Sequence, residues 1–203
     1  MDRLDQVLDA AIPLLRRAES VLDEAGAPSG HPVWEELRRV RLLPADAAHA
    51  VAGLRPSALA EAVPDLRAGA RVCAGAASTL PPPGEWEGEA AEAYDDLRRR
   101  AVTHLSGDGD GLDERFEATA DLAAALHDWM VSTRDNLAAV LAGVLTSAEA
   151  VTLGAPASFP PRPAEIRAAA DLAAYVLSAV AADYSEAEEL LRGSQDLAVP
   201  VPL

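Results

Sequence analysis

Lysine is absent from the sequence, cysteine occurs once, and aromatic residues make up only 4% of it. The 17 basic residues are all arginine and stand against 33 acidic ones, so the formal net charge is −16. A chain this acidic repels phosphate, which excludes a nucleic-acid partner and a polybasic attachment to anionic lipids. The single cysteine, Cys73, excludes an internal disulfide and a zinc site built from several cysteines.

Long apolar runs and an N-terminal leader are also missing. Residues 1–25 alternate charged and apolar groups, unlike a cleaved signal peptide. The longest uncharged runs, near Asn136–Ala148 and Leu172–Ala182, are too short to cross a bilayer. We therefore predict a protein with no membrane span that is cytoplasmic on synthesis and is secreted without a cleaved signal peptide.

Alanine, in contrast, is abundant, with 45 residues, and it is the strongest helix former. Apolar residues recur at alternating spacings of four and three, as in Leu4, Leu8, Ala11 and Leu15, which is the pattern of an amphipathic helix. Stretches rich in proline and glycine interrupt this pattern. The predicted helices cover residues 2–25, 32–54, 56–80, 88–105, 112–153 and 163–192. Within 32–54 one helix is expected to run from Pro32 to Leu43 and a second from Pro44 to Gly53, each with proline in its first turn.

These helices predict an all-α fold, an elongated antiparallel helical bundle that contains a helical hairpin. Residues 1–55 are expected to form a helical segment packed on the bundle, residues 56–193 the hairpin and the bundle, and residues 194–203 a tail. The helix over 112–153 would be ~60 Å long, which favours an elongated arrangement. The glycine-rich stretch Ser106–Gly111 is expected to reverse the chain.

Residues that could carry out catalysis are scattered. The predicted apolar stripes hold alanine, leucine and valine instead of the inward-facing carboxylates and histidines of a helical metal site. One pair, Asp46 and His49, has a ligand-like spacing, and a single pair favours an ordinary surface histidine. We therefore predict no enzymatic activity, no cofactor and no metal site.

A tryptophan lies where a core residue is not expected. Trp86 follows Pro-Pro-Pro-Gly-Glu in a predicted turn, and tryptophan is favoured at protein interfaces. The segment Gly84–Tyr94, with Trp86, Gly88 and Tyr94 at the matching positions, resembles the hairpin turn of the WxG (Esx-type) family. Members of that family are helical-hairpin substrates of type VII secretion in actinobacteria and other Gram-positive bacteria. The resemblance implies a helical hairpin with Trp-x-Gly at its turn.

The same family carries an export signal in which an acidic residue follows a tyrosine by four positions. Tyr184 fits this pattern because Glu188 stands four residues after it. Through the resemblance, the predicted interaction and secretion signal therefore consists of Trp86, Gly88, Tyr94, Tyr184 and Glu188. The length of the chain is closer to the larger helical relatives of the family than to its small single hairpins.

On this basis we expect a non-enzymatic helical protein that acts by helix-mediated recognition, as type VII secretion substrates do. The implied partners are a helical protein, either a second copy or a paralogous Esx-type protein, and the secretion ATPase. The alternative is a cytosolic adaptor or chaperone that binds such substrates and is never exported. In that case Tyr184 would be an ordinary residue beside an apolar stripe.

The helix lengths add one geometric expectation. If Ser106–Gly111 and the proline-rich break at residues 154–163 both reverse the chain, the rise of 1.5 Å per residue puts Trp86 and Tyr184 at one level, ~30 Å along the bundle. One chain would then hold both halves of the family's signal side by side.

Overall fold

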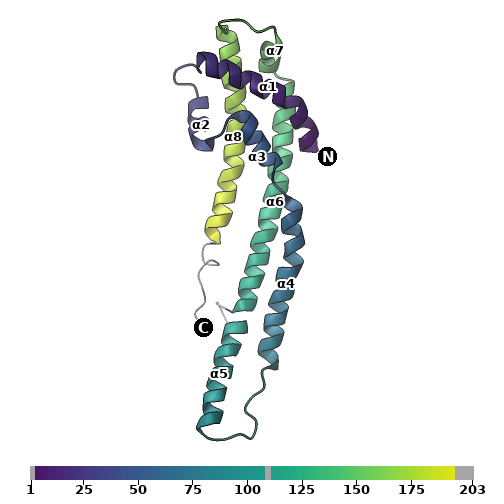
Figure 1. Cartoon of the computed structure of the whole chain (residues 1–203), viewed down its shortest axis with the longest axis vertical. Helices are drawn as coiled ribbons and strands as arrows, with labels where there is room; N and C mark the ends of the chain where they lie inside the picture. Colours follow the sequence, from purple (N-terminus) through teal and green to yellow (C-terminus); the bar gives the residue numbers. More distant parts are fainter. Residues whose placement is uncertain (1–2, 108–110, 195–203) are drawn as a thin grey trace. The chain divides into compact units, whose positions relative to one another are not determined.

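The computed structural model describes residues 3–107 and 111–194, and every element of regular structure in those residues is an α-helix (Figure 1). The predicted all-α fold is thus confirmed. Contacts divide the chain into two units: unit 1 contains residues 1–55 and 129–188, and unit 2 contains residues 56–128 and 189–203. The helices are α1 (Arg3–Ala25), α2 (Val33–Val40), α3 (Pro44–Ala52), α4 (Pro56–Thr79), α5 (Glu89–Ser106), α6 (Leu112–Leu145), α7 (Ala148–Gly154) and α8 (Pro163–Gly193).

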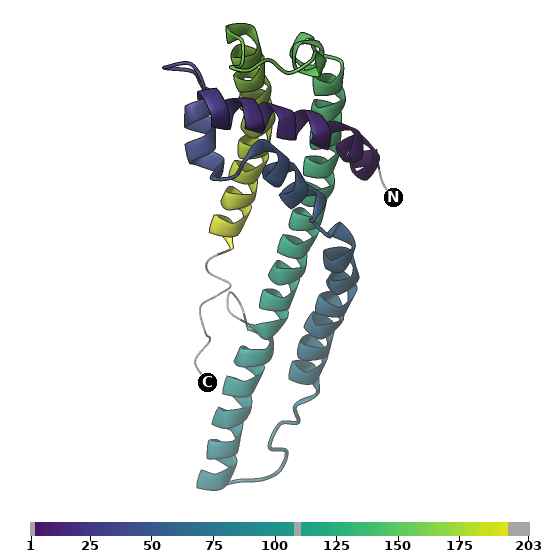
Figure 2. The ribbon, with the colours of Figure 1, turned by 45° about the horizontal axis from the view of Figure 1, so that its top comes forward.

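The core of unit 1 forms where α1 lies across α6 and α8, as both ribbon views show (Figure 2). Leu15 of α1, Leu141 of α6 and Leu177 of α8 are fully buried there. Each such side chain contributes about 1.5–3 kcal/mol by leaving water. The stripe predicted for α1 is buried as far as Ala18, so its four-and-three spacing identifies the face that packs on the core.

One arginine joins three elements of unit 1. Arg134 of α6 donates hydrogen bonds to the carbonyls of Val51 (3.3 Å), Ala52 and Leu54 (3.2 Å), at the end of α3. It also pairs with Asp5 of α1 at 3.4 Å. A cation is favoured at this position because the last carbonyls of a helix lack partners within the helix. Arg134 therefore caps α3 and holds it against α6 and α1.

A buried glutamate closes the N-terminus of α8. Oε2 of Glu165 accepts hydrogen bonds from the Ser158 hydroxyl and from the Arg162 backbone N–H, the latter at 2.7 Å. This is the glutamate half of a capping box, in which the third helical residue bonds back to the residue before the helix. The hydrogen bonds from Ser158 and then Arg162 lower the pKa of Glu165 to about 2.

Acid is expected to weaken unit 1 through Glu165. Its folded pKa of about 2 lies below the ordinary 4.5, so its contribution to stability is complete above about pH 4.5 and is lost as the pH falls toward 2. Glu165→Gln lacks the charge at every pH. In urea titrations followed by circular dichroism, we expect the variant's lower midpoint to approach the parent's as the pH is reduced. An equal deficit at neutral pH and near pH 2 would contradict this role.

Residues 32–54 contain two helices, divided before Pro44 as expected. Arg41 adopts the left-handed conformation (φ 59°), and its N–H bonds to the Leu37 carbonyl at 2.9 Å, which ends α2. Pro44 then begins α3, because its fixed φ and missing N–H suit a first helical turn. The expected continuation of the first helix to Leu43 is therefore wrong at residues 41–43.

The helix predicted over residues 112–153 is also divided. α6 ends at Leu145, the Ser147 hydroxyl accepts a hydrogen bond from the Ala150 N–H at 3.2 Å and caps α7, and the two helices meet at 59°. The bend changes the phase of the apolar stripe that one continuous helix would carry, and Val151 of α7 is 77% exposed. Among the described helices, none alone has the length and hydropathy to span a membrane, and only the bent pair of α6 and α7 meets both limits together.

Unit 2 is held together by small side chains. The buried hydrophobic residues described in it are all alanines: Ala70, Ala77, Ala91, Ala120 and Ala123. A Cβ atom on Gly69 of α4 would lie 3.2 Å from the Phe116 ring of α6, so the absence of a side chain permits this close approach. Cys73 of α4 is half-buried. The helices of unit 2 therefore pack closely and leave little interior space.

The chain is not reversed between α5 and α6. Along α4, the Pro56 carbonyl contacts His127 of α6 (2.9 Å), and Arg67 pairs with Asp121 of α6 (3.2 Å). Just beyond the end of α4, the Pro81 carbonyl accepts a hydrogen bond from the Tyr94 hydroxyl of α5 (2.8 Å). As residue numbers rise along α4 they fall along α6 and then α5, so both helices run antiparallel to α4 (Figure 1).

The reversal expected at Ser106–Gly111 is therefore wrong, although residues 108–110 themselves lie outside the described ranges. Glycine placement indicated a break, and the break occurs between two helices that run in the same direction, both packed on α4. The calculation that put Trp86 and Tyr184 at one level needed this reversal and fails without it.

A large-to-small substitution in the core of unit 1 tests this packing. Leu141→Ala, at a fully buried position, is expected to lower the free energy of unfolding by about 3–5 kcal/mol, from lost transfer energy and the cavity left behind. Val151→Ala, 77% exposed in the same unit, is the control and should stay within about 0.5 kcal/mol of the parent. Equal effects in urea unfolding would show that the burial described here is wrong.

Candidate functional site

The turn between α4 and α5 depends on glycine. Gly88 precedes α5 with φ 95° and ψ −179°, a conformation essentially restricted to glycine. Its carbonyl accepts hydrogen bonds from the N–H groups of Ala91 (2.9 Å) and Glu92 (3.1 Å), which begin the helix. The glycine of the Trp-x-Gly motif is thus explained by backbone geometry, because a side chain at this position would be strained.

Trp86 is held on the outside of this turn. Its ring packs on the Tyr94 ring with centroids 5.8 Å apart, and the Tyr94 hydroxyl donates a hydrogen bond to the Pro81 carbonyl at 2.8 Å. Trp86 nevertheless remains 53% exposed. The indole N–H groups of Trp34 and Trp129 bond to backbone carbonyls, whereas in the described residues that of Trp86 has no partner. The turn therefore presents a positioned aromatic ring with a free donor.

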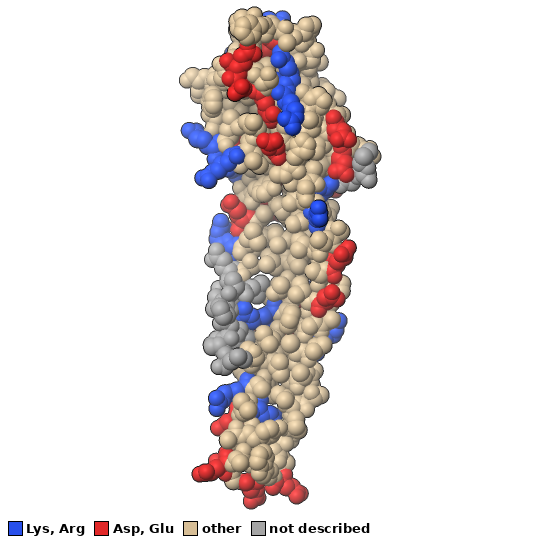
Figure 3. Space-filling view, viewed as in Figure 1, with Lys and Arg blue, Asp and Glu red and all other residues tan. Residues whose placement is uncertain are grey.

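Three glutamates, Glu85, Glu87 and Glu89, lie within three positions of Trp86 in the sequence. All three are exposed, and none forms an ion pair with another described residue. Figure 3 shows acidic side chains gathered over the α4–α5 turn. The turn thus combines an exposed apolar group with unpaired negative charge.

Tyr184 and Glu188, the other predicted signal residues, lie on α8 in unit 1. The Tyr184 ring packs edge-on against Trp129 of α6, with centroids 5.7 Å apart, and is 38% exposed. Burial raises the pKa of the Tyr184 hydroxyl, which therefore stays protonated at neutral pH. The structure brings Trp86, Gly88 and Tyr94 together at one turn, and Tyr184 and Glu188 together on a helix of the other unit.

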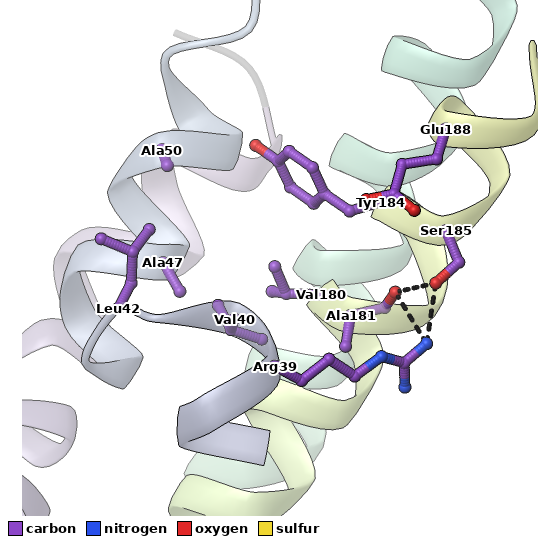
Figure 4. A pocket seen from close by; sticks show the side chains of 10 residues that line it. All are labelled: Arg39, Val40, Leu42, Ala47, Ala50, Val180, Ala181, Tyr184, Ser185 and Glu188. Atoms are coloured by element: carbon purple, nitrogen blue, oxygen red, sulfur yellow. Dashed lines mark hydrogen bonds between the residues drawn. The ribbon is translucent and has the colours of Figure 1, made fainter. Parts of the chain in front are cut away.

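Tyr184 also lines a pocket of about 350 Å³ in unit 1, which we call the α2–α8 pocket (Figure 4). Buried Ala47, Val180 and Ala181 contribute its apolar wall, and the Tyr184 ring points toward α3 in Figure 4. Ten residues line the pocket: Arg39, Val40, Leu42, Ala47, Ala50, Val180, Ala181, Tyr184, Ser185 and Glu188. Its volume is at the lower end of the range of about 300–1,000 Å³ found for ligand sites and suits one large side chain.

Arg39 marks the polar edge of this pocket. One of its terminal nitrogens donates hydrogen bonds to the Ser185 hydroxyl (2.7 Å) and, at 3.4 Å, to the Ala181 carbonyl. These neutral acceptors fix the guanidinium group and leave its charge unbalanced, since among the described residues no carboxylate lies within ion-pair distance. Sequence reasoning missed Arg39 because no motif marks it and because the pocket joins segments about 140 residues apart.

The described residues contain no cluster of histidine, cysteine, aspartate and glutamate that could hold a metal ion. The most strongly shifted carboxylate, Glu165, is occupied in capping α8. No protein-family model, curated protein or solved structure matches this chain. The functional interpretation therefore rests on two surfaces, the α4–α5 turn and the α2–α8 pocket.

Gly88→Ala tests the geometry of the turn. A side chain at φ 95° is expected to lower stability by roughly 1–3 kcal/mol and to weaken the start of α5. Gly143→Ala is the matched control, because Gly143 lies inside α6 and a Cβ atom there would meet nothing within 4 Å. This control should raise stability by up to about 1 kcal/mol through helix propensity. Urea unfolding that shows the same sign for both variants would contradict the assigned turn.

Proposed function

We propose that the chain is a non-enzymatic helical recognition protein that resembles a type VII secretion substrate, with the α4–α5 turn as its contact element. The observation that carries this proposal is the 53% exposure of Trp86 on a turn built by Gly88 and Tyr94. A tryptophan fixed in this way loses little conformational freedom when a partner covers it. The partners proposed are a helical protein and a secretion ATPase.

The adaptor alternative also has support from one contact. Tyr184 packs on Trp129, so its ring stabilises the junction of α8 and α6 without any export role. Under this second proposal the chain stays in the cytosol and binds secretion substrates through the same turn. The two proposals agree on the role of Trp86 and differ on whether the chain leaves the cell.

Trp86→Ala should damage recognition more than folding. Because the side chain is half exposed, its loss should cost less than the ~3–5 kcal/mol typical of a buried aromatic residue. We expect the variant to remain folded by circular dichroism while its level in the culture supernatant of a type VII-competent host falls at least about tenfold. Trp34→Ala is the control, since Trp34 is 43% exposed in unit 1 and should be secreted like the parent.

The same fractionation separates the two proposals. Parent protein that appears in the supernatant, and is lost when the secretion ATPase is disabled, supports export. Parent protein that stays in the cells and captures secretion substrates, with capture lost in Trp86→Ala, supports the adaptor. Unfolding of Trp86→Ala to the extent expected of a core variant would overturn both, because Trp86 would then be a structural residue.

A further inference from the structure

We propose that the α4–α5 turn of one molecule docks in the α2–α8 pocket of a second copy, with Trp86 as the inserted side chain. This inference rests on the proposed function, because it names the partner that covers Trp86. It is carried by the complementarity of two surfaces described above: an exposed indole flanked by unpaired glutamates, and an apolar pocket with Arg39, which forms no ion pair with a described residue, at its edge.

The pocket matches an indole in size and in polarity. Its volume of about 350 Å³ accommodates one large aromatic side chain, and its walls are mainly alanine, valine and leucine. Glu188 at the rim can accept a hydrogen bond from the indole N–H of Trp86, which has no partner within the described residues. The Arg39 guanidinium can stack on the indole face, as arginine does on aromatic rings.

The charges near the pocket and on the turn are opposite in sign, which favours docking. Arg38, Arg39 and Arg41 lie at the end of α2 and just beyond it, and Figure 3 shows basic side chains over this region. In a chain with 33 acidic residues, none of the three forms an ion pair with a described residue. Glu85, Glu87 and Glu89 likewise form no ion pair with a described residue. Docking would bring these two unpaired groups of opposite charge together.

Arg41 adds an independent observation. It ends α2 in the left-handed conformation (φ 59°), where glycine is the favoured residue and a side chain is strained. Its sequence neighbours Val40 and Leu42 both line the pocket. Arg41 thus has a charged side chain at a position that favours glycine, next to two residues of the pocket, and a docked glutamate would supply that charge with a partner.

The contact joins two different surfaces, so it is a head-to-tail contact. After the first contact, the molecule whose turn is docked retains a free pocket and its partner retains a free turn, so association continues into larger species as concentration rises. Sedimentation velocity of the full chain should show this growth over about a hundredfold range of protein concentration.

Two variants separate the surfaces. Trp86→Ala removes the inserted side chain, and Arg39→Glu reverses the charge at the pocket. Each should weaken self-association at least about tenfold, and an equimolar mixture of the two should form a one-to-one dimer, because one supplies an intact pocket and the other an intact turn. Arg3→Glu, the same charge change on an exposed residue of α1, is the control and should associate like the parent.

A third variant distinguishes docking from folding. Arg41→Gly relieves the left-handed strain, so we expect a higher urea midpoint together with weaker association. A parent chain that is monomeric at every concentration would overturn the second-copy proposal. If Trp86→Ala still abolished export or substrate capture, the proposed function would stand with another partner. Self-association that survives in Trp86→Ala or Arg39→Glu would place the contact elsewhere and overturn the docking mode.

Discussion

Close packing of small side chains characterises unit 2. The buried hydrophobic positions described there hold only alanine, and the Phe116 ring of α6 packs on α4 where Gly69 has no side chain. Trp86, at the α4–α5 turn, packs on Tyr94 outside this interior and stays 53% exposed. The recognition role proposed for Trp86 depends on that exposure.

Unit 1 is built differently, and the difference explains where the pocket lies. Its helices bury leucine and valine along α1, α6 and α8, and buried polar contacts at Arg134 and Glu165 fix the helix ends. Large side chains on helices that cross one another leave hollows at their edges, and the α2–α8 pocket is one of these. Arg39, anchored by Ser185, keeps a positive charge at its rim.

The sequence predicted the helices well because proline, glycine and the four-and-three spacing are local features. It located the division before Pro44 but missed that α2 already ends at Val40, since an arginine in the left-handed conformation has no sequence signature. It also missed the division before α7, where Ser147 caps a new helix. Ser106–Gly111 indicated a break and could not indicate the chain direction after it, which depends on contacts with α4. Trp86, Gly88 and Tyr94 were found because one local turn holds them, whereas Arg39 depends on long-range packing.

Fluorine NMR of the chain labelled with 5-fluorotryptophan tests the central claim, that Trp86 is exposed in the free molecule and covered on recognition. Its three tryptophan signals can be assigned from single-tryptophan variants. Trp129 is 7% exposed and Trp86 53%, so the Trp86 signal should show the larger shift between H₂O and D₂O in dilute protein. That sensitivity should fall as concentration rises or a partner is added, while the solvent sensitivity of the Trp129 signal stays small throughout. A Trp86 signal insensitive to solvent in dilute protein would contradict the account.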